Sequence, residues 1–119
     1  MKLLGLRTLI YPSDDLEADK AWWSDVLGLT PYFDQPFYVG FDVGGYELGL
    51  DPNVDMADGP RTYFGVDNVR AAVDHFLSHG CTIHEPPTET GDNIVVATVK
   101  KPNGQLLGLI YNPHFKKEK

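Results

Sequence analysis

Two copies of one tripeptide indicate that the chain contains an internal repeat: Leu48-Gly49-Leu50 and Leu107-Gly108-Leu109. Each copy closes a run of segments in the same order, which is a β-capable segment, a helical segment and three further β-capable segments. The two runs align from their starts, where Thr8 corresponds to Arg61 at an offset of 53 residues. A repeat of this length indicates two copies of one supersecondary unit.

The first copy is predicted to fold as a strand, a helix and three strands. The strand covers residues 4–12 and ends at a proline. The helix begins at a capping box formed by Asp14 and Glu17 and ends at Gly28. The three strands cover residues 30–33, 37–43 and 46–50, and the turn Gly44-Gly45 joins the last two.

The second copy repeats this order after a polar linker. Its first strand covers residues 61–66, and Asp67 is predicted to cap a helix that Gly80 ends. A short strand over residues 81–84 is followed by a turn at Pro86-Pro87. Two strands over residues 94–99 and 106–111 complete the copy, with the turn Pro102-Asn103-Gly104 between them.

These segments predict one α+β domain, residues 1–119, built from two βαβββ modules. The modules cover about residues 4–51 and 61–113, and residues 52–60 link them. Each module has one helix, which covers one face of its strands. We therefore expect a curved mixed sheet with the helices outside and a concave cleft inside, which is where pockets usually form.

The composition excludes several classes of function. The chain has 10 Lys and Arg against 17 Asp and Glu, for a net charge of −7, which argues against a nucleic-acid partner. The lysines of the tail, Lys116, Lys117 and Lys119, are expected to be a solvated end. One cysteine, Cys81, excludes an internal disulfide. Neither a membrane span nor a signal peptide is visible, so we expect a cytoplasmic location without a membrane partner.

Over residues 4–113 the chain resembles the vicinal-oxygen-chelate superfamily. That group comprises glyoxalase I, bleomycin-resistance proteins, fosfomycin-resistance enzymes and extradiol dioxygenases. The stretches that carry the resemblance are Ser13-Asp14-Asp15-Leu16, Trp22-Trp23 followed by Leu27-Gly28-Leu29, Phe64-Gly65-Val66-Asp67 and Lys101-Pro102-Asn103-Gly104-Gln105. The resemblance implies the glyoxalase/bleomycin-resistance fold.

The resemblance also implies four metal-ligand positions, two in each module. They fall here on Thr8, Gly49, Arg61 and Gly108. None of these is a usual metal ligand: the glycines have no side chain, and the guanidinium repels a cation. We therefore expect neither a metal nor another cofactor. The nearest carboxylate, Glu47, is two residues from Gly49 and does not make a metal site alone.

Strand alternation predicts which residues line the cleft. The predicted ligand-binding residues are Thr8, Ile10, Glu47, Arg61, Tyr63, Leu106 and Ile110. The predicted helix-facing core consists of Leu48, Leu50, Phe64, Val66, Leu107 and Leu109. Arg61 suits a planar anion, and the candidate catalytic residues are Tyr63 as proton donor and Glu47 as base. The alternative is that Glu47 and Arg61 neutralise each other as a structural pair.

The remaining aromatic and histidine residues have mainly structural interpretations. His75 and His79 are expected on the outer face of the second helix. One of Trp22 and Trp23 is expected to enter the core. An aromatic group, with core positions expected for at least half of it, consists of Phe33, Phe37, Tyr38 and Phe41.

The sequence leaves three functions open. The first is a metal-free protein that binds a small organic molecule in the cleft, by sequestration or as a ligand-responsive module. The alternative is a lyase, isomerase or dioxygenase of the glyoxalase type, either metal-dependent or with Glu47 as its base. The third is a structural or interaction dimer, and the resemblance implies a homodimer in any case.

Overall fold

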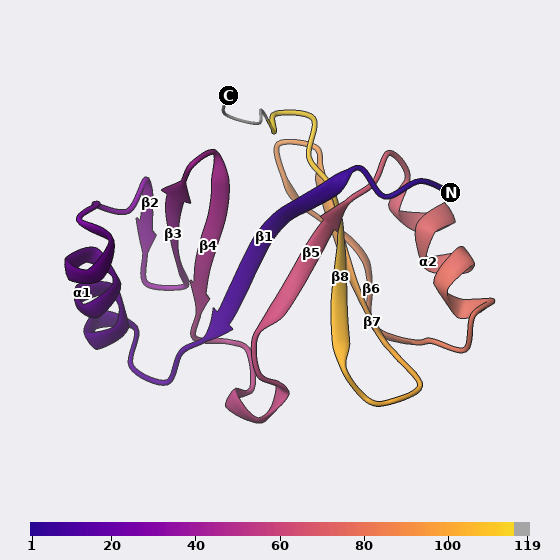
Figure 1. Ribbon diagram of the computed structural model, residues 1–119, viewed down its shortest axis with the longest axis horizontal. Helices are drawn as coiled ribbons and strands as arrows, with labels where there is room; N and C mark the ends of the chain where they lie inside the picture. The colour runs from indigo at the N-terminus through magenta and orange to yellow at the C-terminus, as the bar shows by residue number, and fades with distance from the viewer. Residues whose placement is uncertain (116–119) are drawn as a thin grey trace. The chain divides into compact units, whose positions relative to one another are not determined.

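The computed structural model describes residues 1–115, which form two compact units (Figure 1). The first unit runs from Thr8 to Pro60, and the second begins at Arg61 and also includes Met1–Arg7. Both contain the predicted order of one strand, one helix and three strands. The prediction of an α+β fold with two βαβββ modules is confirmed. The tail lysines Lys116, Lys117 and Lys119 lie outside the described residues.

The first unit has its strands in the order β2-β3-β4-β1. Its elements are β1 (Gly5–Pro12), α1 (Leu16–Leu27), β2 (Phe33–Gln35), β3 (Tyr38–Val43) and β4 (Tyr46–Asp51), followed by a 3₁₀ turn, η1 (Met56–Asp58). Strand β1 is parallel to β4, and the other neighbours are antiparallel. Gly44 and Gly45 both have positive φ, 63° and 88°, as a tight hairpin turn between β3 and β4 requires.

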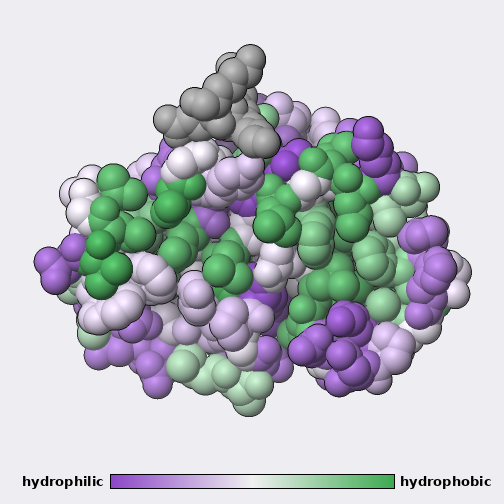
Figure 2. All heavy atoms as spheres, viewed as in Figure 1, coloured by the Kyte–Doolittle hydropathy of each residue, from purple (hydrophilic) through white to green (hydrophobic). Residues whose placement is uncertain are grey.

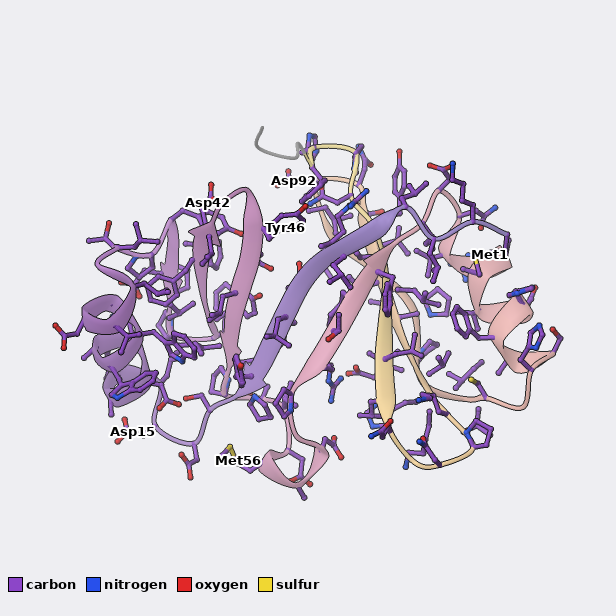
Figure 3. All side chains as sticks on the ribbon, viewed as in Figure 1. Met1, Asp15, Asp42, Tyr46, Met56 and Asp92 are labelled. Carbon is purple, nitrogen blue, oxygen red and sulfur yellow. The ribbon has the colours of Figure 1, made fainter. Side chains whose placement is uncertain are left out.

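The start of α1 differs from the prediction. The N-cap is Asp15, labelled in Figure 3, whose carboxylate accepts a hydrogen bond from the Ala18 backbone N–H at 3.1 Å. The prediction that a capping box of Asp14 and Glu17 begins the helix is therefore wrong by one position. Both aspartates are chemically able to cap, and the non-helical backbone of Asp15, with φ −145° and ψ 86°, decides which one reaches the N–H. The end of α1 at Gly28, with φ 68°, is confirmed.

The second unit has its strands in the order β5-β8-β7-β6. Its elements are β5 (Arg61–Gly65), α2 (Val69–Leu77), β6 (Thr82–Gly91), β7 (Ile94–Lys100) and β8 (Leu106–Tyr111). The helix is capped by Asn68, whose side chain accepts from the Ala71 N–H at 3.0 Å, so the expected cap at Asp67 is also wrong by one residue.

Strand β6 is longer than predicted. The expected strand end and the turn at Pro86-Pro87 are wrong, because β6 continues through both prolines to Gly91. The pairing with β7 shifts register between Glu85 and Thr88, which accommodates the two residues that lack an N–H. Prolines are tolerated here because β6 lies at the edge of its unit's strands.

The core of each unit lies between its helix and one face of its strands (Figure 1). In the first unit Leu50 is buried with Leu48 beside it, and Trp23 of α1 packs on this cluster while Trp22 stays exposed. In the second unit the cluster at α2 contains the predicted core residues Phe64, Val66, Leu107 and Leu109. The predicted helix-facing set is therefore confirmed. We call the opposite face of each unit's strands its helix-free face.

Within residues 1–115, neither helix is long enough and apolar enough to span a membrane. Both are short amphipathic helices that cover their own strands. His75 is exposed on α2, as predicted, whereas His79 is exposed in the turn that follows the helix; the two ring centroids are 4.8 Å apart.

Candidate functional site

The helix-free face of the first unit carries a row of polar side chains. Thr8 of β1 is the pairing partner of Glu47 on β4, and Glu47 is in turn opposite Asp42 on β3. Directly paired residues share a face of a sheet, so these three side chains lie in one line across the strands. Thr8 is buried, whereas Asp42, labelled in Figure 3, is exposed near the turn to β4. Two carboxylates side by side make this face acidic.

Glu47 is held by two tyrosines. The Tyr38 hydroxyl donates to Glu47 Oε1 at 2.8 Å, and the Tyr32 hydroxyl donates to Glu47 Oε2. Burial, together with the neighbouring Glu47, raises the pKa of both phenols above the ordinary value of 10.0. Both hydroxyls therefore keep their protons at neutral pH. We call Tyr32, Tyr38 and Glu47 the tyrosine–carboxylate cluster.

Two glycines make room for this cluster. A Cβ placed on Gly49 would lie 2.6 Å from Cζ of Tyr38 and closer still to its hydroxyl. A Cβ on Gly40 would lie 3.0 Å from Oε2 of Glu47 and 3.1 Å from the Tyr32 ring. The absence of a side chain at Gly49 thus lets the Tyr38 ring lie over the strand and reach the carboxylate.

Exposed aromatic rings continue this face towards β2. The Phe33 ring lies 6.1 Å from that of Tyr38 and 5.9 Å from that of Phe37. Tyr32 and Phe37 are 61% and 58% exposed. Of the aromatic group, only Phe41 is fully buried in the helix-side core, so the expectation that half of it is core is wrong. Figure 2 shows hydrophobic residues at the surface in the region of α1 and β2.

The helix-free face of the second unit has a different polar network. Nη1 of Arg61, on β5, donates to Oε1 of Glu85, on β6, at 2.7 Å. Strands β8 and β7 lie between these two, so the ion pair bridges their width. Thr98 on β7 donates to the same Glu85 oxygen at 3.0 Å, and Nδ1 of His84 lies 3.0 Å from the Thr98 hydroxyl. We call Arg61, Glu85, Thr98 and His84 the His84 network.

The other predicted residues of the second unit lie beside this network. The Tyr63 ring covers Gly108, where an added Cβ would lie 2.6 Å from Cγ of the ring. Tyr63 and Ile110 are buried, and Leu106 is half-buried on the same strand as Ile110. Ile10 in the first unit is also half-buried. Each unit therefore presents a glycine under a tyrosine ring, Gly49 under Tyr38 and Gly108 under Tyr63.

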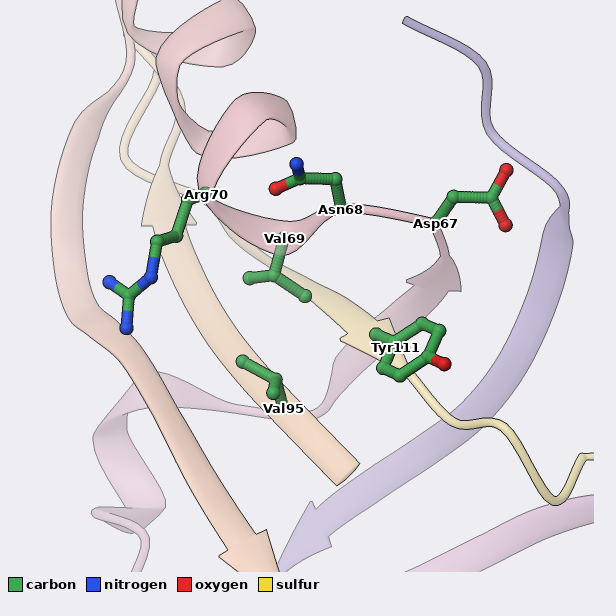
Figure 4. Close-up of a pocket in the computed structure, with 6 residues that line it drawn as sticks. All are labelled: Asp67, Asn68, Val69, Arg70, Val95 and Tyr111. Carbon is green, nitrogen blue, oxygen red and sulfur yellow. The ribbon is translucent and has the colours of Figure 1, made fainter. Parts of the chain in front are cut away.

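A shallow pocket lies elsewhere, at the start of α2 (Figure 4). Its lining residues are Asp67, Asn68, Val69, Arg70, Val95 and Tyr111. Val69, Val95 and Tyr111 belong to the helix-side cluster, so this pocket opens on the helix side of the strands. It contains none of the predicted ligand-binding residues.

A sequence model of the Glyoxalase/Bleomycin resistance protein/Dioxygenase superfamily matches residues 5–109. The chain belongs to this superfamily. No curated protein gives a significant sequence match. The identification confirms the resemblance that the sequence motifs carry.

Solved structures of superfamily proteins are similar to this chain at low sequence identity. A variant of Streptomyces coelicolor methylmalonyl-CoA epimerase, bound to 2-nitronate-propionyl-CoA, has 13% identity and a TM-score of 0.76, over 94% of this chain and 99% of that chain. A superfamily member from Vibrio splendidus 12B01 has 16% identity and a TM-score of 0.68, over 89% and 97%. The Mn(II)-bound glyoxalase of Novosphingobium aromaticivorans has 20% identity and a TM-score of 0.74, over 99% of this chain and 42% of that chain. At these identities the likeness shows the shared fold.

The side chains at the positions that the resemblance gives to metal ligands do not suit a metal. Gly49 and Gly108 lie under tyrosine rings, and Arg61 is paired with a carboxylate. Within residues 1–115 no three His, Cys, Asp or Glu side chains come together as a metal-binding group.

Several polar partners were missed from the sequence. Tyr32 and Tyr38 donate to Glu47, and Arg61 donates to the carboxylate of Glu85. His84, expected at the end of a short strand, lies inside the longer β6. The one available signal was the alternation of Tyr38 with Gly40, which places both on the face of Glu47.

Proposed function

We propose that this superfamily member binds a small organic cation on the helix-free face of its first unit, at the tyrosine–carboxylate cluster. The observation that carries the proposal is that Glu47 accepts hydrogen bonds from both Tyr32 and Tyr38. Binding serves sequestration or ligand sensing, as the likeness to bleomycin-resistance proteins suggests. Glu47, Thr8 and Ile10 are the predicted ligand contacts of this unit.

Hydrogen-bond chemistry selects the charge of the ligand. Each phenol has one proton, and both protons are committed to Glu47. The lone pairs that remain on the two hydroxyl oxygens and on the carboxylate only accept. A ligand that satisfies them must bring N–H or O–H donors, and a positively charged nitrogen also balances the carboxylate. An anionic ligand would meet acceptors and negative charge alone.

The surroundings of the cluster favour the same class of ligand. The exposed rings of Tyr32 and Phe37 offer aromatic faces, which attract organic cations. Asp42 adds a second carboxylate opposite Glu47. The net charge of −7 raises the local concentration of cations around the whole chain.

On the second unit, Tyr63, Leu106 and Ile110 stay predicted ligand contacts of that unit's own helix-free face, and the cation site proposed on the first unit does not depend on them. Arg61 was predicted to hold a planar anion, but its guanidinium is 3% exposed and already holds the carboxylate of Glu85.

The test compares benzamidine with benzamide, which have nearly the same shape but differ in charge. Isothermal titration should show binding of benzamidine and at least tenfold weaker binding of benzamide. Glu47→Gln should weaken benzamidine about 10- to 100-fold, because a hydrogen bond to a charged group contributes about 1.5–3 kcal/mol.

Asp34→Asn is the matched control. Asp34 carries the same charge in the same unit, but it pairs with Lys20 of α1 at 3.1 Å, on the helix side. It should leave benzamidine binding within about twofold, as expected for a screened exposed charge. Equal weakening by both substitutions, or equal binding of both compounds, would refute the proposal.

A further inference from the structure

Two exposed histidines meet at the end of α2. His75 lies in the last turn of the helix, and His79 lies in the turn that follows it. Residues four positions apart along a helical path lie one above the other on the same side. The two ring centroids are 4.8 Å apart, and the ring planes are inclined by 56°. The imidazoles are therefore neighbours at the surface of the second unit.

The separation of the two rings suits two ligands of one metal ion. Imidazole nitrogens bind Zn²⁺ at about 2.0–2.1 Å, so two rings on adjacent positions of one tetrahedral or octahedral ion have centroids about 4.5–5.2 Å apart. The observed separation of 4.8 Å lies within this range. Within residues 1–115, the ring nitrogens of His75 and His79 make neither a hydrogen bond nor an ion pair. Both rings can therefore present a nitrogen to an ion without breaking a polar contact.

The backbone around the two histidines is fixed by hydrogen bonds. The Ser78 hydroxyl donates to the His75 carbonyl at 2.6 Å, and the His79 backbone N–H donates to the Phe76 carbonyl at 3.0 Å. Phe76 packs on the core cluster beneath α2, and its ring lies edge-on to that of His75 with centroids 6.1 Å apart. A fixed backbone lowers the entropy cost of bringing two ligands to one ion.

The electrostatic surroundings favour a cation at this position. The last carbonyl groups of a helix carry a partial negative charge, and His75 lies in the last turn of α2. The net charge of −7 acts in the same direction. Imidazole ligands suit Zn²⁺, Ni²⁺ and Cu²⁺, whereas Mg²⁺ and Ca²⁺ prefer oxygen ligands. The ligand type therefore selects a transition metal.

We propose that His75 and His79 together bind one divalent transition-metal ion, Zn²⁺, Ni²⁺ or Cu²⁺, with water in its remaining coordination positions. The site uses none of the four positions that the superfamily resemblance gives to metal ligands. It also shares no residue with the tyrosine–carboxylate cluster, so the failure of either proposal leaves the other intact.

Isothermal titration of the untagged protein with NiCl₂ tests the site. The native chain should bind one Ni²⁺, and His75→Gln and His79→Gln should each weaken binding at least about tenfold, because two linked ligands bind an ion more tightly than either one alone. MgCl₂ should show no binding. The matched control is His114→Gln, at an exposed histidine whose Nε2 lies 2.9 Å from the Asp92 carbonyl oxygen. It should leave Ni²⁺ binding within about twofold, as expected for an independent site.

The double substitution separates one shared site from two independent ones. If one ion bridges both rings, either single substitution breaks the chelate, and His75→Gln/His79→Gln should bind Ni²⁺ only slightly more weakly than each single variant. Nitrogen-15 NMR with ZnCl₂ should shift the ring signals of His75 and His79 together, ahead of those of His114. The absence of Ni²⁺ binding, unchanged affinity in either single variant, losses that add in the double variant, or an equal loss in His114→Gln would overturn the proposal.

Discussion

Gly49→Ala provides a strict test of the tyrosine–carboxylate cluster. An added Cβ would lie 2.6 Å from Cζ of Tyr38, a separation that real Cβ atoms essentially never show. The strand backbone is held by its neighbours on both sides, so the Tyr38 ring must move. It then loses its 2.8 Å hydrogen bond to Glu47, which is worth about 1.5–3 kcal/mol for a charged acceptor. We expect Gly49→Ala to lower the free energy of unfolding by about 2–3 kcal/mol, in line with other overpacked sites.

The same substitution should behave differently when the ring is absent. In a Tyr38→Ala background the new methyl group has space, and alanine is favoured over glycine in a strand by roughly 0.5–1 kcal/mol. The two substitutions should therefore couple by about 2 kcal/mol or more in a double-mutant cycle. Urea unfolding followed by tryptophan fluorescence measures all four proteins. A neutral Gly49→Ala, or an equal loss in both backgrounds, would show that Tyr38 does not lie over Gly49.

Three further expectations concern the helix cap, the core and the phenols. Asp15→Ala should lower the free energy of unfolding by about 1 kcal/mol in urea unfolding, whereas Asp14→Ala should have little effect. A larger loss for Asp14→Ala than for Asp15→Ala would show that Asp14 is the N-cap. Leu109→Ala, at a fully buried position, should cost about 2–5 kcal/mol in the same assay. Tyr32 and Tyr38 have a raised pKa, so their neutral forms are stabilised by folding; this contribution is complete below pH 10 and falls as the pH rises further. Ultraviolet titration should show tyrosines that ionise only above pH 10, and Tyr38→Phe should remove one of them.

The local features of the fold were predictable because they depend on nearby residues. The turn at Gly44-Gly45 and the end of α1 at Gly28 require a positive φ that glycine adopts easily. The caps were predicted one residue early, at Asp14 and Asp67, because two adjacent side chains were each able to accept the hydrogen bond. Such a choice depends on the backbone angles at the helix start, which residue types do not specify.

The candidate site was predictable only in part. Alternation placed Glu47 and Tyr63 on the helix-free faces, opposite the confirmed core residues. It did not predict that Glu47 contacts Tyr32 and Tyr38, because these residues are brought to it by the pairing of β3 with β4. A bulge in β6 decided the contacts of His84, since one extra residue reverses the side-chain alternation.

The sequence by itself determined the two βαβββ modules and the face of each strand that packs against its helix. Apolar periodicity and turn residues act over a few positions, and they are visible in a linear chain. Tertiary structure alone decided which charges and hydroxyls meet, as Arg61 meets Glu85 across two intervening strands. Hydrogen bonds act over about 3 Å, so their partners depend on strand register and on bulges that no local pattern encodes.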